Sequence, residues 1–273
     1  MSFLRVDITE CASCGTCVEV CPVRILELDA EKRPRVREGR EDDCISCGHC
    51  ACACPKGAIS LDFMPIEKLK ELPAGWRLTP EKAEVFFKGR RSIRVYKDEM
   101  VDKAVIDKMI DIARYAPTGI NRQEVHWAVI HDPNKVKELA GLTVEWMKGL
   151  VAEKSPLAES LHFEGIIKAF ESGSDRICRG APHTVITYAP KADRMAVTDC
   201  VIAMAHFELI ALPFGLGACW AGYLKMALNE YTAARKAAGI SSKAECHGAM
   251  LLGYPKYEYN CIPLRVEPRI IWR

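Results

Sequence analysis

Nine of the 14 cysteines lie before residue 55, and eight of these nine follow a spacing that occurs twice. Residues 11–28 read CASCGTCVEVCPVRILEL and residues 44–61 read CISCGHCACACPKGAISL. Both copies contain Cys-x-x-Cys-Gly-x-Cys-x-x-x-Cys-Pro. Three thiolates at i, i+3 and i+6 on a tight loop can reach three corners of a cubane iron–sulfur cluster, and the fourth thiolate must come from another part of the chain.

This run is the ligation pattern of bacterial two-cluster ferredoxins, in which the fourth cysteine binds the other cluster. Residues 1–62 therefore resemble such a domain. The resemblance implies that the chain holds two [4Fe–4S] clusters. The metal ligands of one would be Cys11, Cys14, Cys17 and Cys54, and those of the other Cys44, Cys47, Cys50 and Cys21. Cys52 has no place in the pattern, and we expect it to act as a small hydrophobic residue.

Other uses of clustered cysteines fit less well. Zinc sites take four ligands, commonly from two separated Cys-x-x-Cys pairs, which leaves the doubled eight-cysteine order unexplained. A disulfide scaffold is typical of short secreted chains, whereas this chain has 273 residues and begins MSFLRVDITE, without an apolar signal segment. We therefore expect a cytoplasmic protein. Its net charge of +2 gives no field that would recruit nucleic acid or anionic lipid.

One segment tests a membrane location. Residues 201–224 are nearly all apolar and about long enough to span a bilayer. The segment contains His206 and Glu208, and Pro213 interrupts it. We interpret it as a buried core helix that ends in a turn, so no membrane partner is predicted.

The elements beyond the repeat indicate a second domain at residues 80–273, after a linker at residues 63–79 that is rich in proline. Thr79 and Pro80 predict a helix start. Periodicity predicts helices at residues 102–115, 133–150, 194–212 and 224–238, and strands at 125–131, 184–188 and 248–253. We expect the substrate pocket in loops at roughly residues 140–180. Helices that alternate with strands predict a mixed helix and sheet domain.

A run of basic residues near the start of this domain could bind phosphate. Arg90, Arg91, Ser92 and Arg94 place three guanidiniums and a hydroxyl within five residues. Guanidinium forks bind phosphate oxygens in pairs. Taken alone, the same run also fits a solvated basic turn. The domain contains no P-loop, no complete dinucleotide fingerprint and no His-Glu-x-x-His zinc motif.

Four segments in order give the domain a resemblance to the nitroreductase family of FMN flavoproteins. They are residues 90–94, residues 116–123 (APTGINRQ), residues 215–223 (GLGACWAGY), and residues 252–255 (LGYP) followed by Arg265. The resemblances together imply an α+β chain. It would consist of a two-cluster ferredoxin-like domain followed by an α/β nitroreductase-like FMN-binding domain.

The resemblance also implies which residues bind FMN. Arg90, Arg91, Ser92 and Arg94 would hold the phosphate, the ribityl chain and the pyrimidine edge, and Arg265 would reach the phosphate. The residues expected along the isoalloxazine ring are Thr118, Gly119, Asn121 and Gln123. The backbone amides of Ala221 and Gly222 would lie near flavin N5. No side chain is identified as a general acid, because a reduced acceptor can take its proton from water.

The resemblance further implies a homodimer with FMN sites made by both subunits. We expect an oxidoreductase that takes electrons from reduced ferredoxin or NAD(P)H and delivers them to a nitroaromatic, a quinone or an activated alkene in an anaerobic cytoplasm. Two alternatives remain at this point. One is a redox carrier or sensor without enzymatic activity, and the other is a flavin reductase or dehalogenase that acts on one specific metabolite.

Overall fold

A computed structural model of the protein describes residues 3–273. The chain forms two compact units. The first contains residues up to Leu78 together with Ile120–Arg122, and the second contains Thr79–Gly119 and Gln123–Arg273. The division after Leu78 lies one residue before the predicted start of the second domain.

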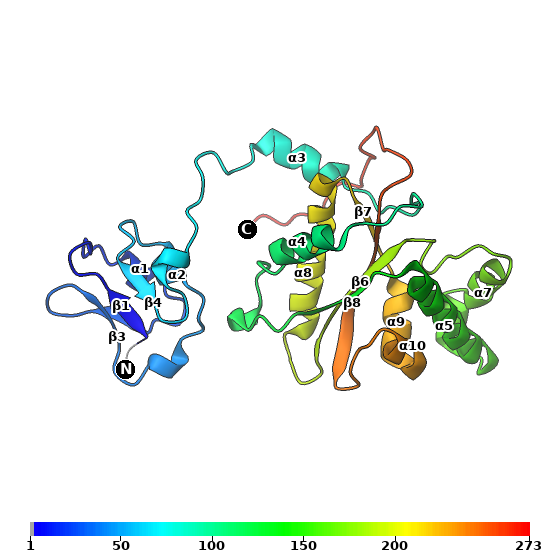
Figure 1. Cartoon of the computed structure of the whole chain (residues 1–273), viewed down its shortest axis with the longest axis horizontal. Helices are drawn as coiled ribbons and strands as arrows, with labels where there is room; N and C mark the ends of the chain where they lie inside the picture. Colours follow the sequence, from blue (N-terminus) through cyan, green and yellow to red (C-terminus); the bar gives the residue numbers. More distant parts are fainter. Residues whose placement is uncertain (1–2) are drawn as a thin grey trace. The chain divides into compact units, whose positions relative to one another are not determined.

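The first unit consists of short elements around the two cysteine motifs (Figure 1). Two antiparallel strand pairs form it, β1 (Leu4–Val6) with β4 (Ile59–Leu61), and β2 (Leu26–Leu28) with β3 (Pro34–Val36). Each motif continues into one helical turn, α1 (Thr16–Glu19) or α2 (His49–Cys52). The short helices η1 (Glu41–Asp43) and η2 (Ile66–Lys68) complete the unit.

The second unit is built on one four-stranded sheet with the order β5-β6-β8-β7. Its strands are β5 (His126–Ile130), β6 (His183–Pro190), β7 (Gly217–Trp220) and β8 (Ala244–Gly253). All three neighbouring pairs are antiparallel. Helices and an antiparallel sheet make an α+β fold, as predicted for the chain as a whole.

Helices cover both faces of this sheet (Figure 1). One face packs against α4 (Lys103–Ala113) and α8 (Ala196–Ala211), around Met204, Phe207 and Met250. The other face packs against α5 (Pro133–Ala152), α7 (Phe163–Glu171), α9 (Gly222–Glu230) and α10 (Thr232–Ala237). The remaining helices are α3 (Pro80–Gly89), η3 (Gly119–Asn121), α6 (Pro156–Ser160) and η4 (Leu212–Phe214).

Three predictions about elements need correction. The expected helix at residues 224–238 is two helices that meet at Tyr231. Residues 140–180, expected to be loops, are largely helical, because α5 runs to Ala152 and α6 and α7 follow it. The segment expected to be one turn, residues 215–223, contains β7. Strand β7 was missed because its four residues include Gly217 and lie between two other glycines, a composition typical of turns.

The apolar segment expected to be a core helix is α8 with η4. Ala196–Phe214 is the one helical segment among residues 3–273 that is long and apolar enough to cross a membrane. On its sheet side, Cys200, Met204 and Phe207 are fully buried in the protein. Asp199 and Glu208 are also buried on this helix, and carboxylates inside a lipid bilayer are costly. The sheet side of the helix is therefore part of the core, whereas Val197 and Val201 on it are exposed.

Candidate functional site

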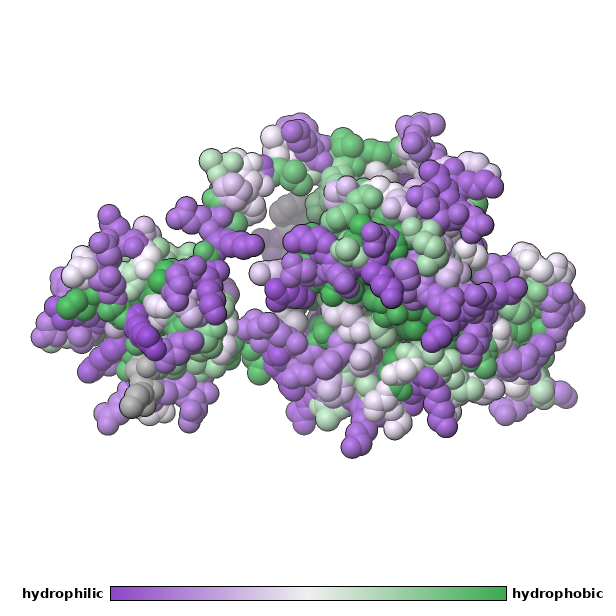
Figure 2. All heavy atoms as spheres, viewed as in Figure 1, coloured by the Kyte–Doolittle hydropathy of each residue, from purple (hydrophilic) through white to green (hydrophobic). Residues whose placement is uncertain are grey.

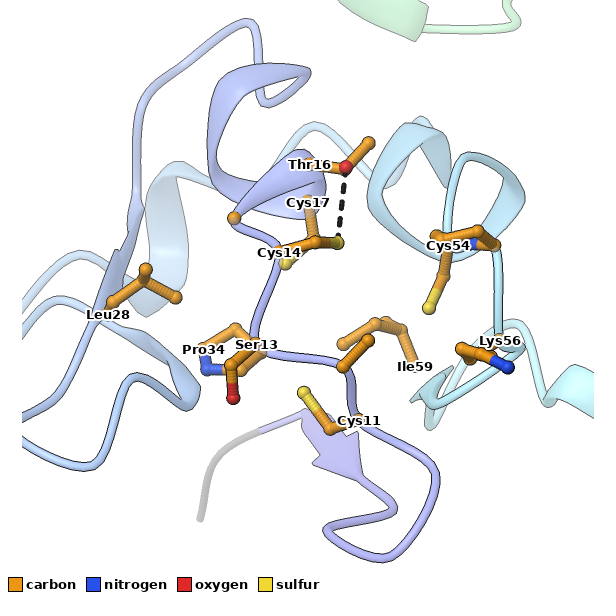
Figure 3. Close-up of a pocket in the computed structure, with 13 residues that line it drawn as sticks. Cys11, Ser13, Cys14, Thr16, Cys17, Leu28, Pro34, Cys54, Lys56 and Ile59 are labelled. Carbon is orange, nitrogen blue, oxygen red and sulfur yellow. Dashed lines mark hydrogen bonds between the residues drawn. The ribbon is translucent and has the colours of Figure 1, made fainter.

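The first cysteine motif wraps around a cavity of the first unit (Figure 3). Cys11, Cys14, Cys17 and Cys54 all line this cavity, whose volume is about 350 Å³ including the part open to solvent. These are the four residues that the ferredoxin pattern assigns to one cluster. Figure 3 shows that Cys54 comes from the second motif and lies across the cavity from the loop of the first.

The second motif surrounds a second cavity of about 360 Å³. Its cysteines are Cys21, Cys44, Cys47 and Cys50, so the fourth residue again comes from the other motif. No residue contributes a sulfur to both cavities. The structure therefore brings the eight predicted ligands together in two sets of four.

The loop geometry explains how each motif curves around its cavity. The serine and the glycine of both motifs have positive φ: 52° and 75° at Ser13 and Gly15, and 52° and 72° at Ser46 and Gly48. Glycine adopts this conformation without steric cost, which gives a physical reason for the Cys-Gly step in both copies. At Gly48 a Cβ atom would also lie 2.8 Å from Cε of Met64. The two loops therefore have matching backbone angles at these residues, and the positive φ favours glycine at both Cys-Gly steps.

The cysteines differ in their surroundings. The hydroxyl of Thr16 lies 3.2 Å from Cys14 Sγ, and this contact lowers the pKa of the Cys14 thiol. Burial raises the pKa of Cys50 to about 11. A thiol with a raised pKa ionises readily only when a metal takes the place of its proton.

The donor set fits a cluster better than a single ion or a disulfide scaffold. All 14 cysteines are free thiols. Among residues 3–273, no group of three or more His, Cys, Asp or Glu side chains is arranged to hold one metal ion. Four sulfurs spread around a cavity match the shape of a [4Fe–4S] cube, which presents a separate iron to each thiolate.

The basic residues of the second unit lie at a cleft of about 780 Å³, including the part open to solvent. Arg90 and Arg91 line it together with Glu208 and Gly217. The side chain of Arg91 donates to the carbonyl oxygen of Lys88, while its Nε atom is buried and has no hydrogen-bond partner in the described part of the chain. A buried guanidinium nitrogen without an acceptor fits a site for an anion such as the FMN phosphate.

Backbone contacts hold this basic segment on the sheet. The amide of Ile93 donates to the carbonyl oxygen of Ala218 in β7 at 2.9 Å. The Ile93 side chain lies over Gly217, where a Cβ atom would come within 2.7 Å of Ile93 Cβ. The absence of a side chain at residue 217 therefore lets the segment lie flat on β7.

Glu208 was not predicted as a site residue. Its Oε1 accepts from Arg90 Nη1 at 2.8 Å, and its Oε2 accepts from Trp220 Nε1 at 3.1 Å. Only about 9% of the residue is exposed. The carboxylate thus joins the basic segment to the residue before Ala221 and Gly222. The feature of the sequence that could have identified Glu208 is an acidic residue within the apolar run that forms α8.

The predicted ring-side residues lie elsewhere in the second unit. Thr118 and Gln123 line a separate cleft of about 640 Å³, including the part open to solvent, beside α4 and α8. The backbone amide of Gly119 lies 3.0 and 3.1 Å from the two carboxylate oxygens of Asp199, a second buried acid on α8 that was not predicted. The neighbouring Asn121 has a φ of 56° and groups with the first unit.

Other predicted FMN residues are outside the basic cleft or already have partners. Ser92 accepts a long hydrogen bond from Arg90, at 3.5 Å. Arg94 and Arg265 are exposed and line neither cleft. The amide of Ala221, predicted to lie near flavin N5, donates to the carbonyl oxygen of Ala249 at 2.8 Å. Gly222 begins α9, where amides have no carbonyl partner within the helix.

Comparison with known families identifies the two parts of the chain. The model described as the nitroreductase family matches residues 87–254, more than half of the chain. The model described as a 4Fe-4S dicluster domain matches residues 10–58. The chain belongs to the nitroreductase family. Its N-terminal part is a 4Fe–4S dicluster domain of the ferredoxin type, as the cysteine spacing predicted.

Relatives support the assignment of the nitroreductase domain. A protein of Archaeoglobus fulgidus with the provisional name NADH dehydrogenase/NAD(P)H nitroreductase is 27% identical over 173 residues, which are 62% of this chain and 83% of the relative. A protein of Methanothermobacter thermautotrophicus with the same provisional name is 26% identical over 168 residues, 62% of this chain and 74% of the relative.

Solved structures share the fold. A nitroreductase with bound FMN from Bacteroides fragilis is 22% identical, with a TM-score of 0.57, and the match covers 71% of this chain and 100% of that one. A nitroreductase with bound FMN from Desulfitobacterium hafniense is 21% identical, with a TM-score of 0.57, over 72% and 100% of the two chains. The nitroreductase fold predicted for the second domain is therefore confirmed.

Proposed function

We propose that this nitroreductase-family protein is an FMN-dependent oxidoreductase that passes electrons from an external donor through two [4Fe–4S] clusters to FMN and on to an organic acceptor. The acceptor class is a nitroaromatic, a quinone or an activated alkene. The observation that carries the proposal is the grouping of eight cysteines around two cavities in a chain that also contains a nitroreductase domain.

The two sets of four thiolates would hold the clusters, in the pairing that the ferredoxin pattern predicts. Arg90 and Arg91 would bind the FMN phosphate, and the buried, unpartnered Nε of Arg91 supports this role. Bound FMN supplies the exchange between donors of single electrons and acceptors of electron pairs. Because clusters carry electrons one at a time and the acceptor takes two, a cluster domain and an FMN domain in one chain complement each other.

The protein would act as a cytoplasmic homodimer, in keeping with the dimers typical of the family. Thr118 and Gln123 line one cleft of the chain and Arg90 and Arg91 line another. Two partial sites of this kind suit an FMN site completed by a second copy, which also fits the tail around Arg265, whose side chains are exposed. The electron donor would be reduced ferredoxin or NAD(P)H, and the relatives' names favour the nicotinamide.

The decisive experiment measures cofactor content and then the electron path in the full-length protein purified without oxygen. We expect ~8 iron and ~8 sulfide per chain, together with tightly bound, extractable FMN. A low-potential one-electron donor should then drive reduction of a nitroaromatic. Iron and sulfide without FMN would instead support a redox carrier or sensor.

Two single variants test whether the clusters that these cysteines would hold carry the electrons. Cys54→Ala should lose one cluster and the activity supported by the one-electron donor. Cys52→Ala is the matched control, because Cys52 is exposed, lies two residues away and lines neither cavity. Unchanged activity in a Cys54→Ala protein that has lost iron would contradict the proposed path.

A further inference from the structure

The two cysteine motifs differ at several paired positions, and at four of these pairs both residues line the cavities. One pair, Leu26 and Ile59, is apolar in both motifs. At the offset of 33 residues, Thr16 corresponds to His49, Ala12 to Ile45, and Val23 to Lys56. The fourth cysteine of each motif crosses to the other cavity, and it takes its neighbours along. The first cavity is consequently lined by Ala12, Thr16 and Lys56, and the second by Val23, Ile45 and His49.

The first cavity has polar side chains near its sulfurs. Thr16 Oγ1 lies 3.2 Å from Cys14 Sγ, and when the sulfur is a ligated thiolate only the hydroxyl has a proton to donate. The amide of Ala58 donates to Cys54 Sγ, also at 3.2 Å. Lys56, two residues after Cys54, also lines this cavity, and its side chain is exposed (Figure 3).

The second cavity has an apolar lining. Ile25, Leu26 and Leu61 are each at most 2% exposed and all contact this space. Its non-cysteine ionisable residue is His49, whose imidazole is exposed. Backbone amides contribute at both cavities, with Val18 donating to Cys17 and Ala51 to Cys50 at equivalent positions. The cavities therefore differ in their side chains and in the amide that Ala58 donates to Cys54.

We propose that the two clusters have unequal reduction potentials, and that the cluster held by Cys11, Cys14, Cys17 and Cys54 has the higher one. This inference rests on the proposed function, because it requires both clusters. Reduction adds one electron, and hence one negative charge, to a cluster, while the external reductant is oxidised by one electron. A hydroxyl donor and an ammonium group stabilise that added charge, whereas an apolar lining does not.

The consequence is an ordered filling of the chain with electrons. The first electron comes to rest on the cluster of the first cavity, and the second cluster is reduced only at a lower potential. The serine and glycine of the two motifs share their positive φ values, so the difference comes from the groups that line each cavity.

The test is a potentiometric titration of the full-length holoprotein, followed by electron paramagnetic resonance, with dithionite as reductant. The titration is run at pH 8.5. Two separate one-electron steps are expected. The double variant Thr16→Val/Lys56→Val should lower the higher step by a tenfold change in its equilibrium constant, about 59 mV, and leave the lower step in place.

Two further variants make the outcome decisive. Val23→Lys, which copies the natural residue of the other motif, should raise the lower step. Lys70→Val removes an exposed charge that lines neither cavity and should move neither step. If the double variant fails to assemble its clusters, the Val23→Lys result decides.

The results that overturn the inference differ from those that overturn the proposed function. Two clusters per chain with one shared potential would refute the inference alone. So would a shift of the lower step in the double variant, or no shift with Val23→Lys. Fewer than two clusters per chain, measured as iron and sulfide, would refute the proposed function and this inference together.

Discussion

Arg91 has a buried side-chain nitrogen without a hydrogen-bond partner in the described part of the chain. Its guanidinium binds the carbonyl oxygen of Lys88, and its Nε faces no acceptor. Arg90 differs, because Glu208 already pairs with it at 2.8 Å. An incoming phosphate would therefore gain more from Arg91 than from Arg90, since leaving a buried donor unpaired is costly.

We predict that Arg91→Ala weakens FMN binding by about 10- to 100-fold, the loss expected when a hydrogen bond to a charged group worth roughly 1.5–3 kcal/mol is removed. The FMN affinity of Arg91→Lys should lie between those of wild type and Arg91→Ala, because lysine keeps the positive charge but lacks the paired N–H donors of the guanidinium. Quenching of flavin fluorescence on titration into apoprotein measures the affinity. Lys137→Ala on α5 is the control, and equal affinities in wild type and Arg91→Ala would exclude a phosphate role.

A pair of stacked histidines forms a buried network in the second unit. The rings of His131 and His183 lie 4.3 Å apart between centroids. The amide of Val101 donates to His183 Nε2 at 2.8 Å, and His183 Nδ1 contacts the His131 carbonyl oxygen at 2.8 Å. His183 must therefore be neutral, with its proton on Nδ1, because Nε2 is an acceptor. Burial lowers the pKa of His183 to about 4.

This lowered pKa predicts how stability depends on pH. Between pH 6.5 and 4, His183 binds a proton in the unfolded chain but not in the folded one, so its contribution to stability falls as the pH is lowered. The full difference is on the order of 3 kcal/mol. Urea unfolding at several pH values should show a shallower pH dependence for His183→Gln than for wild type. Parallel pH profiles of the two proteins would contradict this assignment.

At the scale of elements, helix α8 organises the second unit's two clefts. Met204 and Phe207 anchor it on the sheet, Asp199 binds the backbone before the ring-side loop, and Glu208 binds Arg90 and Trp220. Its two buried acids act on both predicted ends of the cofactor site. A helix with a fixed position on a sheet can hold two distant loops in register with each other.

Gly217 in strand β7 leaves room for Ile93 of the basic segment to pack on the strand. We predict that Gly217→Ala forces Ile93 away and costs about 1–3 kcal/mol of stability, the usual range for overpacking. A lower melting temperature and weaker FMN binding should appear together. The double variant Gly217→Ala/Ile93→Ala should bind FMN better than Gly217→Ala alone, because it removes Cγ1 and Cγ2 of Ile93, two of the three atoms that crowd the new Cβ.

The matched control is Gly141→Ala. Gly141 lies inside α5, and its added Cβ would meet no heavy atom within 4 Å. Alanine favours the helix by about 1 kcal/mol, so this variant should be slightly more stable than wild type. A stabilising effect of Gly217→Ala itself would disprove the packing argument.

At the scale of the whole molecule, the C-terminal tail after β8 indicates that the chain assembles. Residues 261–273 have no helix or strand, and all are exposed. Leu264 is 99% exposed and Val266 is 94% exposed. Val85 and Phe87 of α3 are also exposed, in a region of hydrophobic surface (Figure 2). Apolar side chains left in water along an extended arm favour burial against a second copy.

We predict that the protein is a dimer and that Leu264→Asp/Val266→Asp makes it monomeric. If both subunits build the site, the FMN content should fall when the dimer is lost. Light scattering after size-exclusion chromatography measures the mass, and the flavin absorbance of the same peak measures occupancy. Ile8→Asp, at an exposed apolar residue of the first unit, should stay dimeric. A monomeric wild type, or a dimeric double variant, would show that the tail has another role.

The motifs with short spacing could be read directly from the chain. The eight cysteines, the Cys-Gly steps and the Thr79–Pro80 helix start depend on residues a few positions apart. Local backbone geometry alone determines their conformation, as the matching φ values at Gly15 and Gly48 illustrate. Thr79 accepts a hydrogen bond from the amide of Lys82, as its cap role predicted.

The contacts of the acids on α8 depend on the folded chain. Glu208 reaches Arg90 across 118 residues, and Asp199 reaches Gly119 across 80. No periodicity encodes such separations, because they follow from how the helix packs on the sheet. Packing also decides that the Ala221 amide donates to Ala249 in β8. It likewise places the basic residues and the ring-side residues in two separate clefts. The spacing of residues determined the chemistry available to this protein, and long-range packing determined which groups are free to perform it.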